Sequence, residues 1–253
     1  MRPLLVASLA FALIFGGALL GTFLHARLPG HHLGSDTKDV VRLGAGLIAT
    51  IAALVLGLLI GSANSTFGSQ SGQIKQLTAD IILLDNVLVL YGPETESART
   101  MLRQGIAPLA DRIWRESGSG SGNAITFEAS GFASSFESEL LGLSPRNETQ
   151  RLLKAKALDA NADMARTRLL LFTNAGQTLP MPFLVVLVSW LTIIFASFSL
   201  FAEKNALSIA ALCIYALSAS ASLFLILELS QPFMGLMQIP SEPLRNALAP
   251  LGP

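Results

Sequence analysis

The sequence predicts an all-α integral membrane protein, in which four transmembrane helices carry a membrane-proximal cytoplasmic helical bundle. Of its 253 residues, 51% are hydrophobic and only 13% are charged, whereas about a quarter of the residues in a soluble domain are charged. Charged residues are also missing from four long stretches, which lie between Arg2 and Arg27, Arg42 and Lys75, Arg168 and Glu203, and Lys204 and Glu228. A helix needs about 20 apolar residues to cross a bilayer, so each stretch has room for one span.

The first apolar stretch, residues 3–24, is expected to remain as a span. A signal peptide is the alternative, because Arg2 supplies a charged start, but the run is longer than the roughly 7–15 residues of a signal peptide's apolar core. Gly17 and Gly21 lie four residues apart. Such a pair of small residues lets another helix approach closely in a membrane.

The second span, residues 43–62, carries small residues at every fourth position: Ala45, Ala49, Ala53, Gly57 and Gly61. Close backbone packing drives helix association in lipid, because the lipid tails are as apolar as leucine. The ridge has two interpretations: packing against a neighbouring span of the same chain, or packing around a symmetric central axis. Leu54 and Leu58 stand beside it as large apolar side chains.

The third and fourth spans, residues 181–202 and 206–229, are separated only by Glu203, Lys204 and Asn205. We therefore expect a tight helical hairpin. The fourth span contains an unusually small and polar run from Ser218 to Ser222. These hydroxyls can bond to carbonyls of their own helix, which favours helix packing, and a wetted surface is the alternative.

Four spans place both termini and the segment between spans two and three on one side of the membrane. That side holds most of the basic residues, among them Arg99, Arg103, Arg112, Arg151 and Lys154. Basic residues favour the cytoplasmic side, so we expect a multi-pass protein of the cell inner (plasma) membrane with cytoplasmic termini. The expected organisation is spans one and two with their loop over 1–62, a cytoplasmic helical domain over 63–180, a transmembrane hairpin over 181–230 and a C-terminal tail over 231–253.

The pattern of the segment between spans two and three predicts a helical bundle. Helical periodicity lapses over the small polar residues 65–72 and then returns in steps of three and four, the pattern of a helix packed on a helix. The residues of this stripe are Ile74, Leu77, Ile81, Leu84, Leu88 and Tyr91. Gly92 is expected to end the helix, and Pro93 and Glu94 to begin the next, which reaches about residue 115.

Two further helices follow a Ser-Gly loop at 117–122. The first is a short amphipathic piece around 132–141. The second begins near Ser144 and Pro145 and reaches about Ala175. We expect its apolar residues to pack against the first helix of the segment; they are Leu152, Leu158, Ala162, Ala165, Leu169 and Phe172.

No pattern in the chain points to catalysis. The sequence has no Gly-rich phosphate loop, nucleophile elbow or His-Glu helix motif. His25, His31 and His32 lie near Asp36 and Asp39 without the spacing of a familiar metal site, so a solvated loop is favoured. The formal net charge is zero, which gives no basic surplus for nucleic acid. We expect no enzyme activity, no cofactor, no metal and no nucleic-acid partner.

Acids near the membrane are candidate functional groups. Asp80 and Asp85 are interpreted as a solvated flank of their helix, with a charged ring in an oligomer's vestibule as the alternative. Glu228 ends the fourth span and is either interfacial or functional. Pro232 should end that span within one turn of Glu228. A carboxylate there opposes the helix dipole, so a basic partner is expected, and the candidates are Arg166, Arg168 and Arg245.

Several stretches together resemble a family of bacterial membrane proteins described as the bestrophin-like domain of unknown function. They are residues 31–62, 79–93 and 182–186, and the ending Glu228-Leu-Ser-Gln-Pro232-Phe233-Met-Gly235. The resemblance implies four spans with cytoplasmic helical extensions that assemble as a pentamer around an ion pore. It also implies inorganic ions, membrane lipid and further copies of the chain as partners. The acidic calcium-binding run of animal bestrophins is absent after span four, as is the aromatic neck of their pore helix.

Three functions remain open at this point. The first is an oligomeric channel, with span two lining or bracing the pore through Ala49, Ala53, Leu54, Gly57, Leu58 and Gly61, and with Glu228, Pro232 and Phe233 as a structural or gating element. The second is a non-conducting scaffold that binds a protein partner through its cytoplasmic helices. The third is a proton-driven stator, which shares the layout but for which no acid lies in the middle of a span.

Overall fold

The computed structural model describes residues 3–27, 35–119, 129–174, 181–202 and 205–249. Every regular element in these residues is helical, as predicted. The elements are α1 (Pro3–Arg27), α2 (Ser35–Tyr91), the 3₁₀ turn η2 (Pro93–Thr95), α3 (Glu96–Ser119), α4 (Ala129–Gly142), α5 (Glu148–Asn174), α6 (Met181–Leu200), α7 (Ala206–Leu229) and α8 (Glu242–Arg245). Four of them, α1, α2, α6 and α7, are long and apolar enough to cross a membrane, which confirms the predicted spans.

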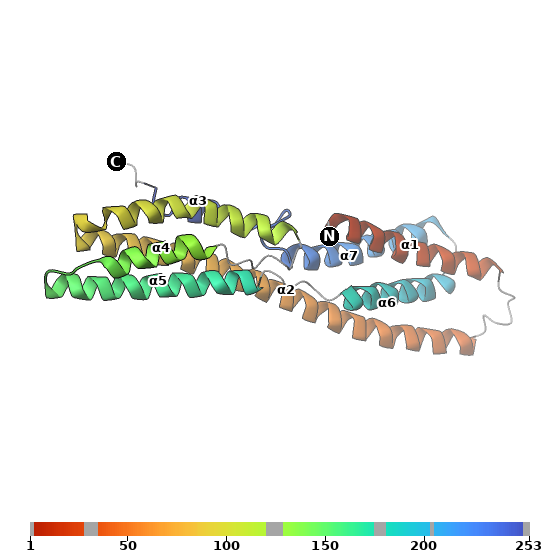
Figure 1. The fold of residues 1–253 in the computed structure, drawn as a ribbon. Helices are drawn as coiled ribbons and strands as arrows, with labels where there is room; N and C mark the ends of the chain where they lie inside the picture. Colours follow the sequence, from red (N-terminus) through yellow and green to blue (C-terminus); the bar gives the residue numbers. More distant parts are fainter. Residues whose placement is uncertain (1–2, 28–34, 120–128, 175–180, 203–204, 250–253) are drawn as a thin grey trace. The chain divides into compact units, whose positions relative to one another are not determined.

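The chain forms two compact units (Figure 1). The span unit comprises Met1–Thr66 and Thr178–Ser230, and the bundle unit comprises Phe67–Gln177 and Gln231–Pro253. Helix α2 contributes to both, because it continues without a break through the small polar residues 65–72. Helix formation is cooperative, and packing stabilises helices more than propensity does. Packing at both ends of α2 therefore stabilises the helical conformation of the glycine-containing residues between them.

In the span unit, α1 packs against both α6 and α7. A Cβ on Gly17 would lie 2.6 Å from Thr192 Cγ2, and one on Gly21 would overlap Ser199 and the carbonyl of Ala196. Further along, His25 Nδ1–H donates to the carbonyl of Leu200 at 2.7 Å. The paired numbers rise together, so α1 and α6 run in the same direction. The predicted role of the Gly17–Gly21 pair is confirmed, and its partner helix is α6.

Helix α7 has defined ends. Asn205 caps its start, with its side-chain oxygen accepting from the backbone N–H of Ser208 at 2.6 Å, while Glu203 and Lys204 lie outside the described residues. At the other end, the helix stops at Leu229 and Ser230 caps it, so the predicted end within one turn of Glu228 is confirmed. Inside the helix, the hydroxyls of Ser220 and Ser222 donate to the carbonyls of Leu217 and Ser218, as expected for serines that pack.

In the bundle unit, the predicted stripe from Ile74 to Tyr91 is buried throughout. It packs against α3 through two clusters, one that includes Ala98 and Leu102 and another that includes Ile106 and Ile113. Helices α4 and α5 close the first cluster through Phe136, Leu140, Ala157 and Ala160. Through these contacts α3, α4 and α5 pack around the second half of α2.

The face of α5 that packs inward differs from the prediction. Of the six predicted residues, Leu158 and Phe172 are partly buried against the two clusters, whereas Leu152, Ala162, Ala165 and Leu169 are exposed. The buried residues of α5 are Ala157, Ala160 and Leu171. The predicted positions are offset by about one residue from the buried ones, and one residue turns a helix face by roughly 100°. The inner face of α5 is the one that carries the small alanines and the buried Thr167.

Helix α5 also begins at Glu148 and not at Ser144. The side-chain oxygen of Asn147 caps it by accepting from the N–H of Gln150 at 2.8 Å. The expected end near Ala175 lies outside the described residues, as does part of the expected Ser-Gly loop.

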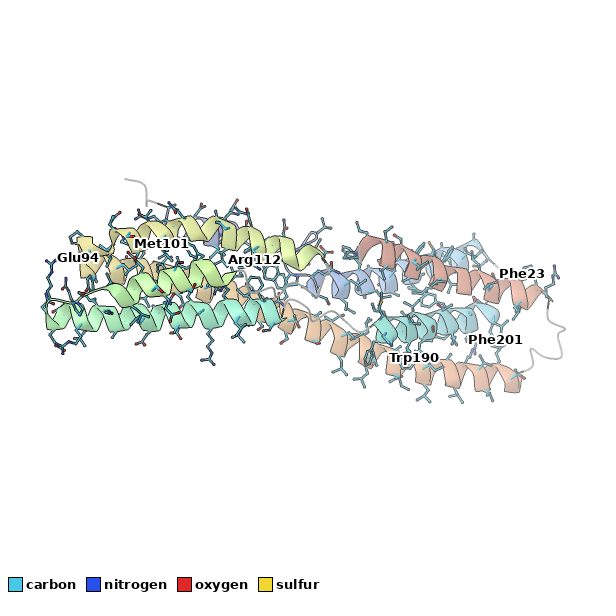
Figure 2. The ribbon with its side chains drawn as sticks, viewed as in Figure 1. Phe23, Glu94, Met101, Arg112, Trp190 and Phe201 are labelled. Carbon is cyan, nitrogen blue, oxygen red and sulfur yellow. The ribbon has the colours of Figure 1, made fainter. Side chains whose placement is uncertain are left out.

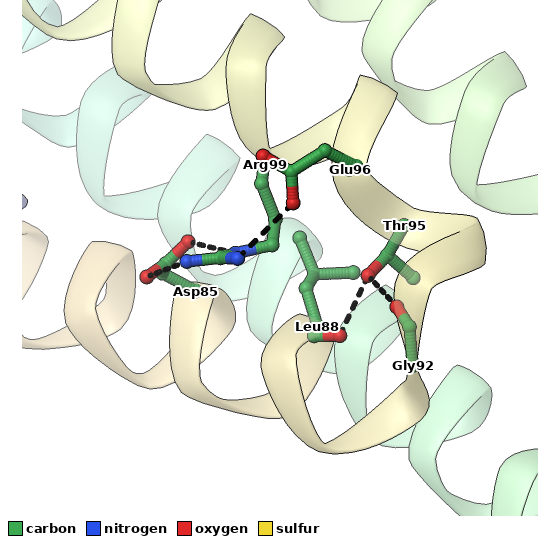
Figure 3. A network of polar contacts seen from close by, with 6 residues as sticks. All are labelled: Asp85, Leu88, Gly92, Thr95, Glu96 and Arg99. Carbon is green, nitrogen blue, oxygen red and sulfur yellow. Dashed lines mark hydrogen bonds and ion pairs between the residues drawn. The ribbon is translucent and has the colours of Figure 1, made fainter.

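Two sets of polar contacts hold the end of α2, one from the turn η2 and one from α3 (Figure 3). Thr95 Oγ1 donates to the carbonyls of Leu88 at 2.6 Å and Gly92 at 2.8 Å, which satisfies the end of α2. Arg99 Nε and Nη2 donate to the two carboxylate oxygens of Asp85 at 2.8 and 3.3 Å. Asp85 is therefore half-buried in an ion pair, and Asp80 is buried with one oxygen accepting from Gln76 Nε2. The prediction of a solvated acidic flank is wrong for both residues.

Candidate functional site

Within the span unit, α2 buries only one side. Ala45, Ala52 and Ala63 are buried. Ala52 and the partly buried Ile48, Ala49, Leu56 and Leu59 share a core with Leu184 and Leu187 of α6 and Leu223 of α7. The spacing of three and four residues between these positions is that of one helix face. This face holds α2 against the rest of the span unit.

A second face of α2 is small and uncovered. Ala53, Gly57 and Gly61 are exposed, and a Cβ built on Gly57 or Gly61 would meet nothing within 4 Å. Gly46 and Thr50 continue this face towards the start of the helix, with Thr50 Oγ1 donating to the carbonyl of Gly46 at 2.9 Å. A backbone this bare can admit another helix at short range.

A third face of α2 is large and apolar. Leu54 and Leu58 are 66% and 67% exposed, and Leu43 and Leu47 are exposed in the same way. Each large side chain stands next to a small one in the sequence, Leu54 beside Ala53 and Leu58 beside Gly57. At each level, α2 therefore presents one narrow and one bulky residue beyond its buried side.

The predicted ridge does not follow one side of the helix. Four residues turn an α-helix about 40° beyond a full turn, so the positions from Ala45 to Gly61 wind round it. Ala45 is buried and Ala49 partly buried against the same chain, while Ala53, Gly57 and Gly61 are exposed. Packing within the chain accounts for the first part of the ridge alone. A role for Ala49, Ala53, Leu54, Gly57, Leu58 and Gly61 at a pore stays a prediction.

Glu228 lies in the last turn of α7 and is 2% exposed. Just beyond it, the Ser230 hydroxyl donates to the carbonyl of Ile226 at 2.6 Å and the Ser230 N–H donates to it at 3.1 Å. Of the three arginines expected as partners, Arg245 contacts Asp111. Burial raises the cost of an uncompensated charge, so the acid is more than a solvated surface group.

Pro232 and Phe233 belong to the bundle unit, so the chain passes from one unit to the other between them and Glu228. Phe233 is buried and meets the Trp114 ring edge to face, with 5.4 Å between centroids. Trp114 Nε1–H donates to the carbonyl of Ile239 at 3.0 Å, and Ile239 N–H donates to the carbonyl of Pro232 at 2.7 Å. These contacts close residues 232–239 into a loop anchored on α3.

The predicted histidine loop offers no metal geometry in the part that the structure describes. His25 bonds to the carbonyl of Leu200, Asp39 is exposed, and His31 and His32 lie outside the described residues. Across those described ranges, no group of three His, Cys, Asp or Glu side chains is close enough to hold a metal ion.

A further feature of the span unit was not predicted from the sequence. A cavity of about 310 Å³ lies where α1 and α6 end and α7 begins, lined by Thr22, Phe23, Ala26, Ala202, Ser208, Ile209 and Leu212. Figure 2 labels Phe23 on α1 and Phe201, which precedes Ala202, at this end of the span unit. Its lining comes from residues 22–26 and 202–212, two regions far apart in the chain, so no local pattern could reveal it.

Comparison with known proteins shows the family of the chain. The sequence model of the bestrophin-like domain matches residues 12–244, which takes in most of α1, all of α2 to α7 and the anchored loop after Pro232. Neither a curated protein nor a solved structure matches the chain.

Proposed function

Because this chain belongs to the bestrophin-like domain family, we propose that it is an ion channel that assembles as a homopentamer in the membrane. Inorganic ions pass along an axis that the copies of α2 surround. The apolar helices α1, α6 and α7 stand outside α2 and hold it in the bilayer.

The observation that carries this proposal is how little of α2 its own chain covers. In the most apolar window of each span, 11% of the residues are buried for α2, against 28% for α1, 28% for α6 and 22% for α7. An outer helix of a bundle can leave much of its surface to lipid. A helix that is least covered and also carries bare glycines at Gly57 and Gly61 suits contact with further copies.

The two uncovered faces of α2 suit two tasks in such an assembly. The small face of Ala53, Gly57 and Gly61 lets the α2 helices of adjacent copies approach. The neighbouring Leu54 and Leu58 then form apolar rings around the axis. Apolar constrictions gate by excluding water, so these rings act as the gate.

The proposed topology puts both termini and the bundle unit on the cytoplasmic side of the plasma membrane. The bundle carries Arg99, Arg103, Arg112, Arg151 and Lys154, and basic residues favour the cytoplasmic side. A fluorescent protein fused after Pro253 should be resistant to protease added to intact cells and be cleaved after lysis. Cleavage in intact cells would show that the C-terminus lies on the outer side of the membrane, opposite to the proposed topology.

The function is tested on purified full-length protein in planar bilayers, with its oligomer measured by native mass spectrometry. Cys213 is first replaced by serine, and a single cysteine is then placed at Leu58 or, as control, at the exposed lipid-facing Leu217 of α7. A charged methanethiosulfonate reagent should block the current of Leu58→Cys and leave Leu217→Cys unchanged.

Two results would overturn the proposal. A monomer in lipid would remove the pore, because one copy of α2 encloses nothing. A stable oligomer without current would favour the scaffold instead, and the reversal potential of any current measures which ions pass.

A further inference from the structure

The cavity at the ends of α1 and α6 has an apolar wall. Phe23, Ala26, Ile209 and Leu212 supply side chains that cannot hydrogen-bond, and the Thr22 hydroxyl is turned to the carbonyl of Leu19 at 2.7 Å. Its volume of about 310 Å³ falls at the lower end of the range of roughly 300–1,000 Å³ that ligand sites show. Phe23 and Ile209 are also exposed on the outside of the unit, so the cavity opens to the surface that the bilayer covers. An apolar chain fits these walls.

One positive charge lies against a lining residue of the same cavity. The Arg27 guanidinium carbon lies 4.9 Å from the centre of the Phe23 ring, which lines the cavity. This is the distance of a cation–π contact, which holds Arg27 beside the apolar wall. Lys38 makes a similar contact with the Phe201 ring at 5.9 Å, but Phe201 is not among the lining residues.

The start of α7 adds to this positive charge. Ser208 and Ile209, in the first turn of the helix, line the cavity. Asn205 accepts from both of their N–H groups, through its side-chain oxygen from Ser208 and through its carbonyl from Ile209. The first turn of a helix still carries partial positive charge from the helix dipole. Arg27 and the helix start thus place positive charge beside the apolar wall.

We propose that this cavity is a binding site for an anionic phospholipid. One acyl chain occupies the wall of Phe23, Ile209 and Leu212, and the phosphate group lies at Arg27. The site is at the end of the spans where the α1–α2 and α6–α7 connections lie, so it takes its lipid from that leaflet. The inference does not depend on conduction, because it concerns α1, α6 and α7 within one chain.

The test measures lipid retention by the purified full-length protein. Delipidated protein is mixed with phosphatidylglycerol or with phosphatidylcholine of the same acyl chains, and native mass spectrometry counts the bound lipids. A single surface cation contributes about 1 kcal/mol to binding an anionic headgroup, so phosphatidylglycerol should be retained about fivefold better. Arg27→Gln should bring that ratio close to one, while Arg42→Gln, which removes the same charge from an exposed residue outside the lining, should keep it.

A second variant tests the contribution of the acyl chain to lipid retention separately from that of the headgroup. Ala26→Leu places extra volume in the lining without changing charge, and Ala26 is exposed enough for the helix to tolerate it. Retention of both lipids should fall. Soluble glycerol phosphate should not compete, because it has no acyl chain. Equal retention of the two lipids by the unaltered protein, unchanged retention in Arg27→Gln, or displacement by glycerol phosphate would each overturn the proposal.

Discussion

Gly21 and Ser199 set how closely α1 and α6 approach each other. A side chain of even one carbon on Gly21 would overlap the Ser199 hydroxyl and the backbone carbonyl of Ala196. The serine cannot turn away without cost, since its hydroxyl bonds to that same carbonyl at 3.1 Å. The approach of two backbones is what stabilises a helix pair in lipid, so this contact is central to the span unit.

We expect Gly21→Ala to destabilise the protein by about 1–3 kcal/mol, the cost of overfilling a packed contact. Gly16→Ala is the matched control, because a Cβ there would meet nothing within 4 Å. Thermal unfolding in detergent, followed by tryptophan fluorescence, measures both. Equal melting temperatures for the two variants would show that α1 and α6 do not pack as described.

We expect Gly57→Leu to weaken the oligomer and to leave the folded chain intact. Nothing in the chain lies within 4 Å of a Cβ at Gly57, so the clash arises only when another copy approaches. Gly44→Leu makes the same change on α2 where the space is also open, on a different side of the helix. Size-exclusion chromatography with light scattering should show smaller particles for Gly57→Leu alone. Two variants that both keep the native size would remove the small face of α2 from the interface.

We expect Leu84→Asp to unfold the bundle unit. Leu84 is 0% exposed, and an unpaired buried charge costs more than about 3 kcal/mol. Leu83→Asp adds the same charge at an adjacent, exposed residue and should be tolerated. Limited proteolysis should cleave the bundle of Leu84→Asp much faster than that of Leu83→Asp, and similar rates would show that the stripe is not a core.

The sequence was sufficient where one pattern had one interpretation. The stripe from Ile74 to Tyr91 alternates steps of three and four with large apolar residues, and all six positions are buried. Gly17 and Gly21 predicted a close helix contact, and Pro232 predicted the end of α7. Local steric and hydrogen-bonding rules decide these features.

The sequence was insufficient where two patterns compete or where distant residues meet. Helix α5 offers leucines on one face and alanines on another, and α3 and α4 leave room only for small residues such as Ala157 and Ala160. The Arg99–Asp85 pair joins two helices, so no spacing within one helix points to it. The small residues of α2 were predicted to form one continuous ridge, but a four-residue repeat winds round the helix, so the ridge passes from the buried side to an exposed side. The roles of its exposed residues depend on partners that one chain does not contain.

We expect Arg99→Met to destabilise the bundle by about 1–3 kcal/mol, because it leaves the partly buried Asp85 without its charge-assisted hydrogen bonds. Asp85→Ala combined with Arg99→Met should cost less than the sum of the two single changes. Chemical denaturation of all four proteins measures this coupling. Additive effects would mean that the two side chains do not stabilise each other.

The same pair predicts a flat response to alkaline pH. The hydrogen bond to Asp85 raises the pKa of Arg99 above its ordinary value. A raised pKa means that the stabilisation is fully present below the ordinary pKa of the unfolded arginine, which is already strongly alkaline, and is lost only as pH rises through the folded value. The destabilisation caused by Arg99→Met should therefore be equal at pH 7 and pH 10. A loss that shrinks by pH 10 would assign the effect to another group.

Glu228 gives the last prediction, since a carboxylate that is 2% exposed at the C-terminal end of a helix faces the negative end of the helix dipole. Such a group requires compensation by hydrogen bonds or positive charge. Glu228→Gln keeps the shape and removes the charge, so we expect a lower melting temperature and an altered open probability with normal membrane insertion. Glu242→Gln, on the exposed first turn of α8, is the control. Membrane fractionation, thermal unfolding and single-channel recording separate insertion, packing and gating, and a Glu228→Gln protein that matches the control in all three would show that the charge of this acid has no role.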